Sequence, residues 1–382
     1  MDIWHLNLRH LQAVAEIARL QTVKRAASSV NLTQPAITQA LKRMEELLGH
    51  QLFERRHDGM VPTPAADLFV PRIEAALSHI ASPHVTMSRM RALIALAATG
   101  SYSGASALTG LSLPSLHRSV GDLALSGKKK LVERRGKAVA LTDTGQAMAR
   151  AFRLAQKELQ TGLAELASLR GLETRAIAVG AMPLSRARVL PAAVTQFIRQ
   201  RPAVQLTILE GSRAELVEPL RSGTIDMMVG ALRQPLIEPD LDQRELFHDV
   251  PVVVGRKGHP LDNAAPQPAE LAHYDWVLAG PGAPLRDVFE RYFEACGVPP
   301  PKVPVESGSV MTIREMLMGS DFLTLLSPDQ VRVELEAGWL TLIARLPAEF
   351  GRTIGVTTRA SWHPTEVHRE FLSLLDKAAQ SQ

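Results

Sequence analysis

The sequence has 382 residues, a length that predicts two or three domains because single hydrophobic cores rarely extend over so long a chain. Although 46% of the residues are hydrophobic, there is no run of about 18 apolar residues and no basic and apolar leader at the start. A membrane-spanning or secreted protein is therefore not expected, and the net charge of +4 is only mildly basic.

The chain has a single cysteine, Cys296, which excludes an internal disulfide and fits a reducing compartment. We therefore expect a cytoplasmic protein. Cys296 lies in an apolar stretch that ends at Gly297, so we predict a buried structural thiol rather than a reactive one.

A segment near the amino terminus recurs 79 positions later without a gap. We call residues 1–82 the first repeat and residues 83–145 the second repeat. Between residues 13 and 63, ten aligned positions are identical: Ala13/Ala92, Ala18/Ala97, Ala26/Ala105, Leu32/Leu111, Pro35/Pro114, Leu52/Leu131, Glu54/Glu133, Arg55/Arg134, Arg56/Arg135 and Thr63/Thr142.

The first repeat predicts three helices followed by a hairpin. The third helix is expected to follow Thr33, whose hydroxyl can cap it, with Pro35 in its first turn and Gly49 at its end. Strands are expected at residues 52–56 and 60–63, around the turn signal Asp58-Gly59. This order is typical of a winged helix-turn-helix module, which binds DNA.

A helix with apolar residues spaced alternately by four and three follows each repeat. The first, residues 64–80, carries Phe69, Ile73, Ala76 and Ile80. The second is expected to be capped by Asp143 and to carry Met148, Phe152, Ala155, Leu159, Gly162, Leu166 and Leu169. This heptad-like pattern fits a dimerising linker helix, and it also fits packing against the rest of the same chain.

Positive charge is concentrated around the second repeat. Residues 83–150 contain ten Lys or Arg and three acidic residues, whereas residues 1–80 contain nine Lys or Arg and eight acidic residues. Such a surface attracts phosphate, although the run from Lys128 to Lys130 also fits a solvated face. Gly121 and Gly127 should weaken the third helix of this repeat.

Beyond Arg170-Gly171, strands and helices alternate. Apolar strands are expected at residues 176–180, 204–209, 226–230, 250–255, 276–278, 322–326 and 353–357. Helices are expected around residues 194–197 and 214–221. This alternation predicts a parallel α/β sheet.

Four segments carry a family resemblance. Thr33-Gln34-Pro35-Ala36, with Leu52-Phe53-Glu54-Arg55 seventeen residues beyond Pro35, resembles the LysR-type transcriptional regulators. Gly223-Thr224-Ile225-Asp226 and Gly258-His259-Pro260-Leu261 resemble two later segments of that family. The resemblance covers residues 1–82 and 145–382. The second repeat is a departure, because the family ordinarily carries one module.

The resemblance implies a ligand-responsive regulator that binds promoter DNA and a small-molecule effector. It also implies a homodimer or tetramer, with RNA polymerase as a further expected partner. The expected fold is multidomain: all-α winged helix-turn-helix modules at 1–82 and 83–145, a linker or dimerisation helix at 146–172, and an α/β effector domain at 173–382. The last resembles type 2 periplasmic binding proteins, with subdomain I at about 174–248 and 352–382 and subdomain II at about 249–351. Strands near 250–254 and 353–357 would form the hinge.

The first turns of such a third helix reach base edges in the major groove. The candidates for DNA binding in the first repeat are Thr33, Gln34, Pro35, Thr38 and Gln39, with Arg43, Arg55 and Arg56 expected on phosphates. Relatives often carry Arg at the positions of Gln39 and Asp58.

In the second repeat, Arg118 and Lys137 occupy the positions of Gln39 and Asp58, while Leu113 replaces Gln34 and Asp122 replaces Arg43. Arg118, Lys128 and Lys137 are therefore additional candidates for DNA binding. Two interpretations stay open: the second repeat contacts DNA mainly through phosphates, or it serves as a spacer or dimer contact.

Ligands of open α/β sheets bind beyond the carboxyl ends of the strands, near helix amino termini. The candidates for effector binding are Ser185, Arg186, Ser212, Pro284, Arg286 and Ser309. The family resemblance implies that Ser185 and Ser212 lie close to the effector. Serine hydroxyls, helix amino termini and arginines suit a small carboxylate, so an organic acid is expected. Ordinary helix caps and surface arginines are the alternative interpretation.

No enzyme, cofactor or metal site is predicted. Gly280-Pro281-Gly282 lacks the remainder of a dinucleotide-binding fingerprint, no P-loop lysine occurs, and the twelve histidines show no metal-ligand spacing. A solute-binding protein of the transport type is the alternative function for residues 174–382, since it would share the fold.

Overall fold

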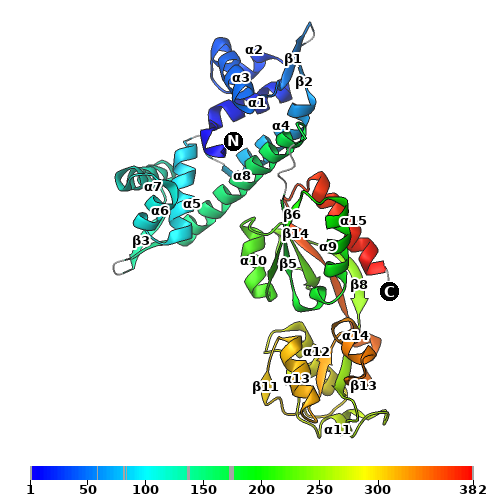
Figure 1. The fold of residues 1–382 in the computed structure, drawn as a ribbon. Coiled ribbons are helices and arrows are strands. Elements are labelled where there is room, and N and C mark those ends of the chain that lie inside the picture. Colours follow the sequence, from blue (N-terminus) through cyan, green and yellow to red (C-terminus); the bar gives the residue numbers. More distant parts are fainter. Residues whose placement is uncertain are drawn as a thin grey trace. The chain divides into compact units, whose positions relative to one another are not determined.

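A computed structural model describes residues 2–57, 59–80, 82, 84–135, 138–171 and 176–380 (Figure 1). The chain divides into two compact units, Met1–Arg175 and Ala176–Gln382. Among the helices described, none is long and apolar enough to cross a membrane.

The first repeat begins with a short 3-10 helix, η1 (Ile3–His5), and three α-helices, α1 (Leu8–Leu20), α2 (Val23–Ser29) and α3 (Gln34–Leu48). An antiparallel hairpin of β1 (Phe53–Arg56) and β2 (Gly59–Pro62) and the helix α4 (Pro64–Ile80) follow. Thr33 caps α3 and Gly49 ends it in the left-handed region, as predicted. The predicted turn residue Asp58 lies outside the described residues.

The second repeat follows the same order, with α5 (Met87–Thr99), α6 (Tyr102–Thr109), α7 (Leu113–Gly127), β3 (Val132–Arg135) and β4 (Ala138–Leu141). Its left-handed residues Gly100, Gly110 and Lys128 lie 79 positions after Gln21, Asn31 and Gly49, which are also left-handed. The two repeats therefore share backbone conformation as well as sequence. Each is helical with a β-hairpin, so "all-α" was too narrow a description.

The third helix of the second repeat, α7, has 15 residues, the same number as α3, although it contains Gly121 and Gly127. One expectation about the second repeat was wrong. The cap of the following helix, α8 (Asp143–Ser168), is Thr142 rather than Asp143. The Thr142 hydroxyl accepts a hydrogen bond from the Gly145 amide at 3.1 Å and donates to the Lys130 carbonyl at 2.7 Å. The Thr142 hydroxyl thus links the start of α8 to the segment before β3. An aspartate carboxylate could accept the hydrogen bond from Gly145 but could not donate one to the Lys130 carbonyl.

The helices α4 and α8 lie side by side in the amino-terminal unit (Figure 1). Most of the predicted apolar seam of α8 is buried: Phe152, Ala155, Leu159, Gly162 and Leu166. Leu169 at its end is 48% exposed. In this structure the apolar face of α8 thus packs against α4, a helix of the same chain.

The carboxyl-terminal unit, which we call the effector unit, contains a five-stranded sheet in the order β6-β5-β7-β14-β8. The strands are β5 (Ala176–Ala181), β6 (Gln205–Glu210), β7 (Met227–Ala231), β8 (Leu241–Asp249) and β14 (Arg352–Arg359). The helices that belong to this part are α9 (Val189–Gln200), α10 (Arg213–Arg221) and α15 (Glu366–Gln380). β5 pairs in parallel with β6 and β7, but β14 is antiparallel to β7 and β8, so the predicted parallel sheet is in fact mixed.

A second group of strands surrounds another core. β9 (Val252–Arg256) lies between β12 (Thr324–Leu326) and β13 (Leu340–Arg345), and β10 (Val277–Leu278) pairs with β11 (Val305–Glu306). The fully buried Trp276 packs on Phe289 and Phe293 in this core. The helices here are α11 (Pro268–Leu271), α12 (Pro284–Ala295), α13 (Val310–Met318) and α14 (Pro328–Glu336).

Cys296 is exposed, so the predicted buried thiol was wrong. The residue is the carboxyl-terminal cap of α12 and lies just beyond the helix. The buried face of α12 is formed earlier in the helix by Val288, Phe289, Tyr292 and Phe293.

Candidate nucleic-acid interface and effector site

The amino-terminal turns of α3 form an exposed polar surface. Gln34, Thr38 and Gln39 are exposed, while Ile37 and Leu41 on the opposite face are buried. The Thr33 hydroxyl accepts a hydrogen bond from the Ala36 amide at 3.4 Å, which fixes the start of the helix. The Thr38 hydroxyl donates to the Gln34 carbonyl at 3.0 Å. This leaves the Gln34 and Gln39 amides as the long polar groups of the surface, and a glutamine amide can donate and accept at one adenine.

Arg43, Arg55 and Arg56 extend the positive charge from α3 to the wing, and all three are exposed. Arg56 pairs with Glu54 at 2.8 Å, an exposed ion pair that contributes little and that a phosphate can replace. Burial, and secondarily the charge of Arg43, lower the pKa of His10. This shift favours the uncharged form of the His10 imidazole beside Arg43.

The second repeat exposes Arg118 and Lys128, and Lys137 lies outside the described residues. Leu113, at the position of Gln34, is 44% exposed. Asp122, at the position of Arg43, pairs with Arg89 at 2.7 Å and joins α7 to α5. Two charges of this repeat are therefore used for internal packing, and the exposed cations that remain include Arg118 and the run Lys128–Lys130.

In the effector unit, Ser185, Arg186 and Ser212 follow the adjacent parallel strands β5 and β6. Ser185 and Arg186 belong to the 3-10 helix η2 (Pro183–Arg186), and the buried Ser185 hydroxyl donates to the Met182 carbonyl at 2.8 Å. Ser212 caps α10 in a capping box with Glu215. This box lowers the pKa of the Glu215 carboxyl, chiefly because the Ser212 backbone amide donates to it. Arg186 pairs with Glu210 at the end of β6.

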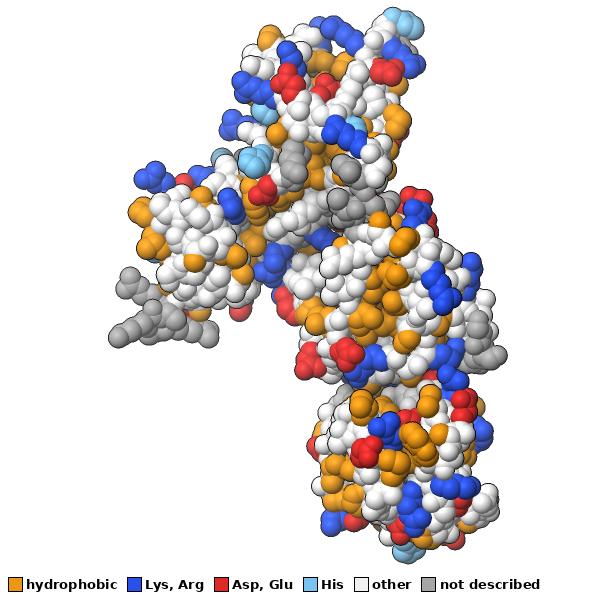
Figure 2. All heavy atoms as spheres, in the orientation of Figure 1, with side chains coloured by type: hydrophobic (Ala, Val, Ile, Leu, Met, Phe, Trp, Pro, Cys, Tyr) orange, Lys and Arg blue, Asp and Glu red, His pale blue; other side chains and the backbone are white. Residues whose placement is uncertain are grey.

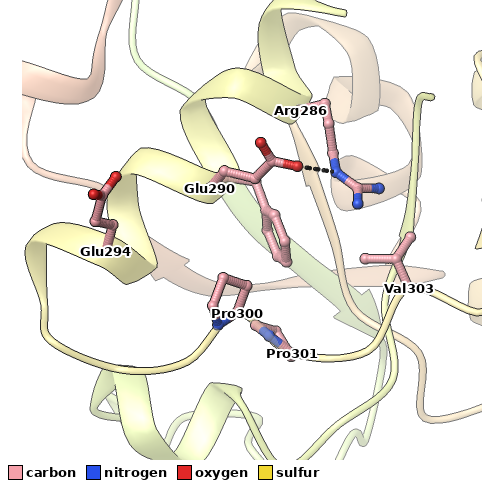
Figure 3. A pocket seen from close by; sticks show the side chains of 7 residues that line it. Arg286, Glu290, Glu294, Pro300, Pro301 and Val303 are labelled. Atoms are coloured by element: carbon pink, nitrogen blue, oxygen red, sulfur yellow. Dashed lines mark hydrogen bonds and ion pairs between the residues drawn. The ribbon is translucent and has the colours of Figure 1, made fainter. Parts of the chain in front are cut away.

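The other candidates lie after β10 and β11. Pro284 is in the first turn of α12, and Ser309 caps α13 by accepting from the Thr312 amide at 3.3 Å. Arg286 donates to Glu290 at 2.8 Å and lies 3.5 Å from Glu306. With Phe289 and three residues of the following loop, Pro300, Pro301 and Val303, it lines a surface pocket of about 490 Å³ (Figure 3).

The predicted effector residues thus form two groups, one after β5 and β6 and the other after β10 and β11. Sequence reasoning missed the carboxylates that accompany the arginines, namely Glu210, Glu290 and Glu306. A signal existed for Glu290, which follows Arg286 by four residues in one helix. Both candidate arginines are therefore already paired, and an anionic ligand has to compete with these carboxylates.

A buried polar cluster lies where the chain crosses between the two groups of strands. Asp249 accepts a hydrogen bond from the Ser327 hydroxyl at 2.6 Å and one from Arg352 Nε at 2.9 Å. Nearby, Arg188 before α9 pairs with Asp329 of α14 at 2.8 Å. None of these residues was predicted, because their partners are far apart in the sequence. Among the residues described, no group of three His, Cys, Asp or Glu is arranged to hold a metal ion.

Two family models match this chain. The model described as "LysR substrate binding domain" matches residues 170–380, which is more than half of the chain. The model described as "Bacterial regulatory helix-turn-helix protein, lysR family" matches residues 8–67 and again residues 87–146. The chain belongs to the LysR family of transcriptional regulators.

Relatives of this LysR-family regulator agree with the assignment. The HTH-type transcriptional regulator GalR of Pseudomonas putida is 27% identical over 373 residues, covering 94% of each chain. Among solved structures, a full-length OxyR variant from Pseudomonas aeruginosa matches with a TM-score of 0.59 and 24% identity. ArgP from Mycobacterium tuberculosis matches with a TM-score of 0.60 and 15% identity. The OxyR match covers 78% of this chain and 96% of that one, and the ArgP match covers 77% and 97%, so both support the fold.

Proposed function

We propose that this regulator reads promoter DNA through the exposed amino-terminal turns of α3 and answers to a small carboxylate bound in the effector unit. The observation that carries the proposal is the polar surface of Gln34, Thr38 and Gln39 on a capped helix, within a segment that matches the family's helix-turn-helix model. Arg43, Arg55 and Arg56 would hold the backbone of the same DNA segment. In this proposal the protein is cytoplasmic, RNA polymerase is a further partner, and the chain has no enzymatic role.

Replacing Gln34 and Thr38 by alanine is expected to weaken binding to the preferred DNA sequence by roughly tenfold to a hundredfold, since a base contact contributes about 1–3 kcal/mol. Binding to unrelated DNA should change little, because the phosphate-binding side chains are unchanged. The measurement is fluorescence anisotropy with duplexes selected by the natural protein. Glu46→Ala, an exposed position near the end of the same helix, is the control. An equal loss on both kinds of DNA would contradict the proposed role.

We propose further that the second repeat is a winged helix-turn-helix module that touches DNA mainly through phosphates. Its elements, its left-handed residues and the second match of the family model support this interpretation. The solved structures named above leave about a fifth of the chain unmatched, a share close to one repeat. Leu113 in place of Gln34 removes an amide that could read a base, which also suits a spacer or dimer contact, whereas the surplus of positive charge favours contact with phosphates.

Replacing Arg118 and Lys128–Lys130 by alanine should make binding less dependent on salt. For each phosphate that loses its cationic partner, the slope of log affinity against log salt falls by about 0.9, so a decrease of up to ~3.6 is expected for four. A matched control removes four exposed cations from the effector unit, Arg199, Arg233, Arg291 and Lys302. If both quadruple variants keep the natural slope, the second repeat is a spacer or dimer contact.

The effector proposal rests on Ser185, Ser212 and Ser309 and on the two paired arginines. A carboxylate could replace Glu210 beside Arg186 or Glu306 beside Arg286, and helix amino termini provide further donors. At a hundredfold excess over the dissociation constant, such a ligand stabilises the protein by about 2.7 kcal/mol. That predicts a rise in melting temperature of roughly 5–10 °C.

A thermal-shift screen tests this with organic acids, each paired with its uncharged amide. An acid should stabilise the protein where its amide does not, and Arg186→Ala or Arg286→Ala should remove the difference. Stabilisation by the amide alone, or by no acid in the panel, would contradict a carboxylate effector.

Association into a homo-oligomer is proposed to use β6 and α9 of the effector unit. β6 is an edge strand of its sheet, with Ile208 42% and Leu209 38% exposed, and Ile198 of α9 is 37% exposed. Figure 2 shows hydrophobic side chains gathered on the face that carries these elements. An unpaired strand beside exposed apolar side chains suits a second copy of the same strand.

A further inference from the structure

The repeat in the sequence continues into the helices that follow each wing. Four buried or partly buried positions of α4 recur 79 residues later in α8: Phe69/Met148, Ile73/Phe152, Ala76/Ala155 and Ile80/Leu159. The helix α4 is therefore the first copy of an element whose second copy is the first half of α8. The helix α4 packs along α8 within one chain.

The helices α4 and α8 run in opposite directions (Figure 1), and a contact near the start of α4 sets their register. The Phe69 ring packs so closely on Gly162 that a Cβ atom there would lie 2.6 Å from it. Phe69 lies seven residues before Ala76, and Gly162 lies seven residues after Ala155. With the helices antiparallel, this contact places Ala76 close to Ala155, and these equivalent positions of the repeat are both fully buried. Antiparallel pairing centred on equivalent residues is the arrangement that a two-fold axis produces.

A buried cluster of one arginine and two glutamates joins α4 to α8. Arg72 of α4 donates to Glu165 of α8 at 2.9 and 3.1 Å and to Glu158 at 3.0 Å. All three side chains are at most 10% exposed. The position equivalent to Arg72 in the second repeat is Ala151, so two identical α4 helices or two identical α8 helices could not make this cluster. The sequence thus favours pairing of α4 with α8.

We propose that one chain forms a complete pair of DNA-binding heads, so that a single chain occupies both halves of its operator. This inference rests on the proposed function of the two repeats. The apolar seams of α4 and α8 cover each other, and each repeat packs its first helix on the helix that follows it, α1 on α4 and α5 on α8. Figure 1 shows the two wings at opposite ends of the α4–α8 pair.

The two heads of this pair are not equivalent. The first presents Gln34 and Gln39 on its third helix, and the second presents Leu113 and Arg118 at the same positions. The operator is therefore expected to have one half whose sequence is strongly constrained and another that is held with little base preference. A dimer formed through the effector units would carry four heads on two such pairs.

A cysteine pair tests the pairing within the chain. Ala76→Cys and Ala155→Cys are introduced into full-length protein that also carries Cys296→Ser. Mild oxidation should give a disulfide within one chain, seen as a faster band of monomer mass on a non-reducing denaturing gel. A disulfide-linked dimer, or no disulfide in protein that is folded by circular dichroism, would overturn the proposal. The single variants with Cys296→Ser are the controls for random pairing.

The number of chains bound per DNA duplex tests the proposal that one chain occupies both halves of its operator. A short duplex with one selected site is titrated at concentrations far above the dissociation constant. Saturation is expected at one chain per duplex, whatever the association of the effector units, because each chain brings its own pair of heads. A break at two chains per duplex would overturn this proposal and leave the proposed function intact. Absence of any sequence-preferring complex would contradict the proposed function itself.

Discussion

Replacing Arg72 by alanine should destabilise the amino-terminal unit by about 3–5 kcal/mol, because Glu158 and Glu165 would remain buried without a positive partner. The three side chains are at most 10% exposed, and Arg72 reaches both carboxylates at 2.9 to 3.1 Å. In a unit of this size the loss corresponds to a fall in melting temperature of roughly 10 °C. Differential scanning calorimetry of the full chain measures it.

Two controls separate removal of the ion cluster from removal of packing. The triple variant with Met at Arg72, Glu158 and Glu165 removes all charges while keeping volume, so it should be close to the natural protein or more stable. Arg19→Ala breaks the exposed pair with Glu16 and should cost at most about 1 kcal/mol. If Arg72→Ala lowers the free energy of unfolding no more than Arg19→Ala does, the cluster does not stabilise the contact between α4 and α8.

Replacing Asp249 by alanine should destabilise the effector unit by about 3 kcal/mol or more. Arg352 would then be buried without its carboxylate, and the Ser327 hydroxyl would lose its acceptor. Because Asp249 lies where the chain crosses between the two groups of strands, the variant should lower the melting transition of the effector unit alone. The same calorimetric scan shows whether the transition sensitive to Arg72 keeps its position.

The matched control for Asp249 is Asp321→Ala. Asp321 also pairs with an arginine, Arg256, but the Asp321 side chain is 47% exposed and the Arg256 side chain 33%. Because the pair is exposed, we expect the substitution to lower the free energy of unfolding by at most about 1 kcal/mol. Equal effects of the two substitutions would show that burial at the crossing is not what makes Asp249 important.

Local signals predicted the secondary structure of the amino-terminal unit well. The cap Thr33, the proline after it and the final Gly49 each act on the backbone around them, so the bounds of α3 could be predicted from the sequence. The repeat then carried the same prediction to α7. Thr142 was missed as a cap because Asp143 beside it is an equally good cap by residue type.

Structural features that depend on residues distant in the sequence were predicted less well. The spacing in α8 indicated a buried face, but periodicity does not identify what covers that face, and here it is α4. The alternation of strands and helices predicted a parallel sheet, yet the last strand, β14, enters between β7 and β8 in antiparallel orientation. Glu210 beside Arg186 and Glu306 beside Arg286 also follow from such tertiary placement.

The most direct test of a DNA-reading regulator is selection of fragmented genomic DNA by the full-length protein, with sequencing of what is retained. The natural protein should enrich a small set of promoter fragments that share one motif. The Gln34→Ala and Thr38→Ala double variant should lose that enrichment while still retaining bulk DNA at low salt. Enrichment of the same fragments by the double variant, or of no fragments by the natural protein, would contradict the reading of DNA through α3.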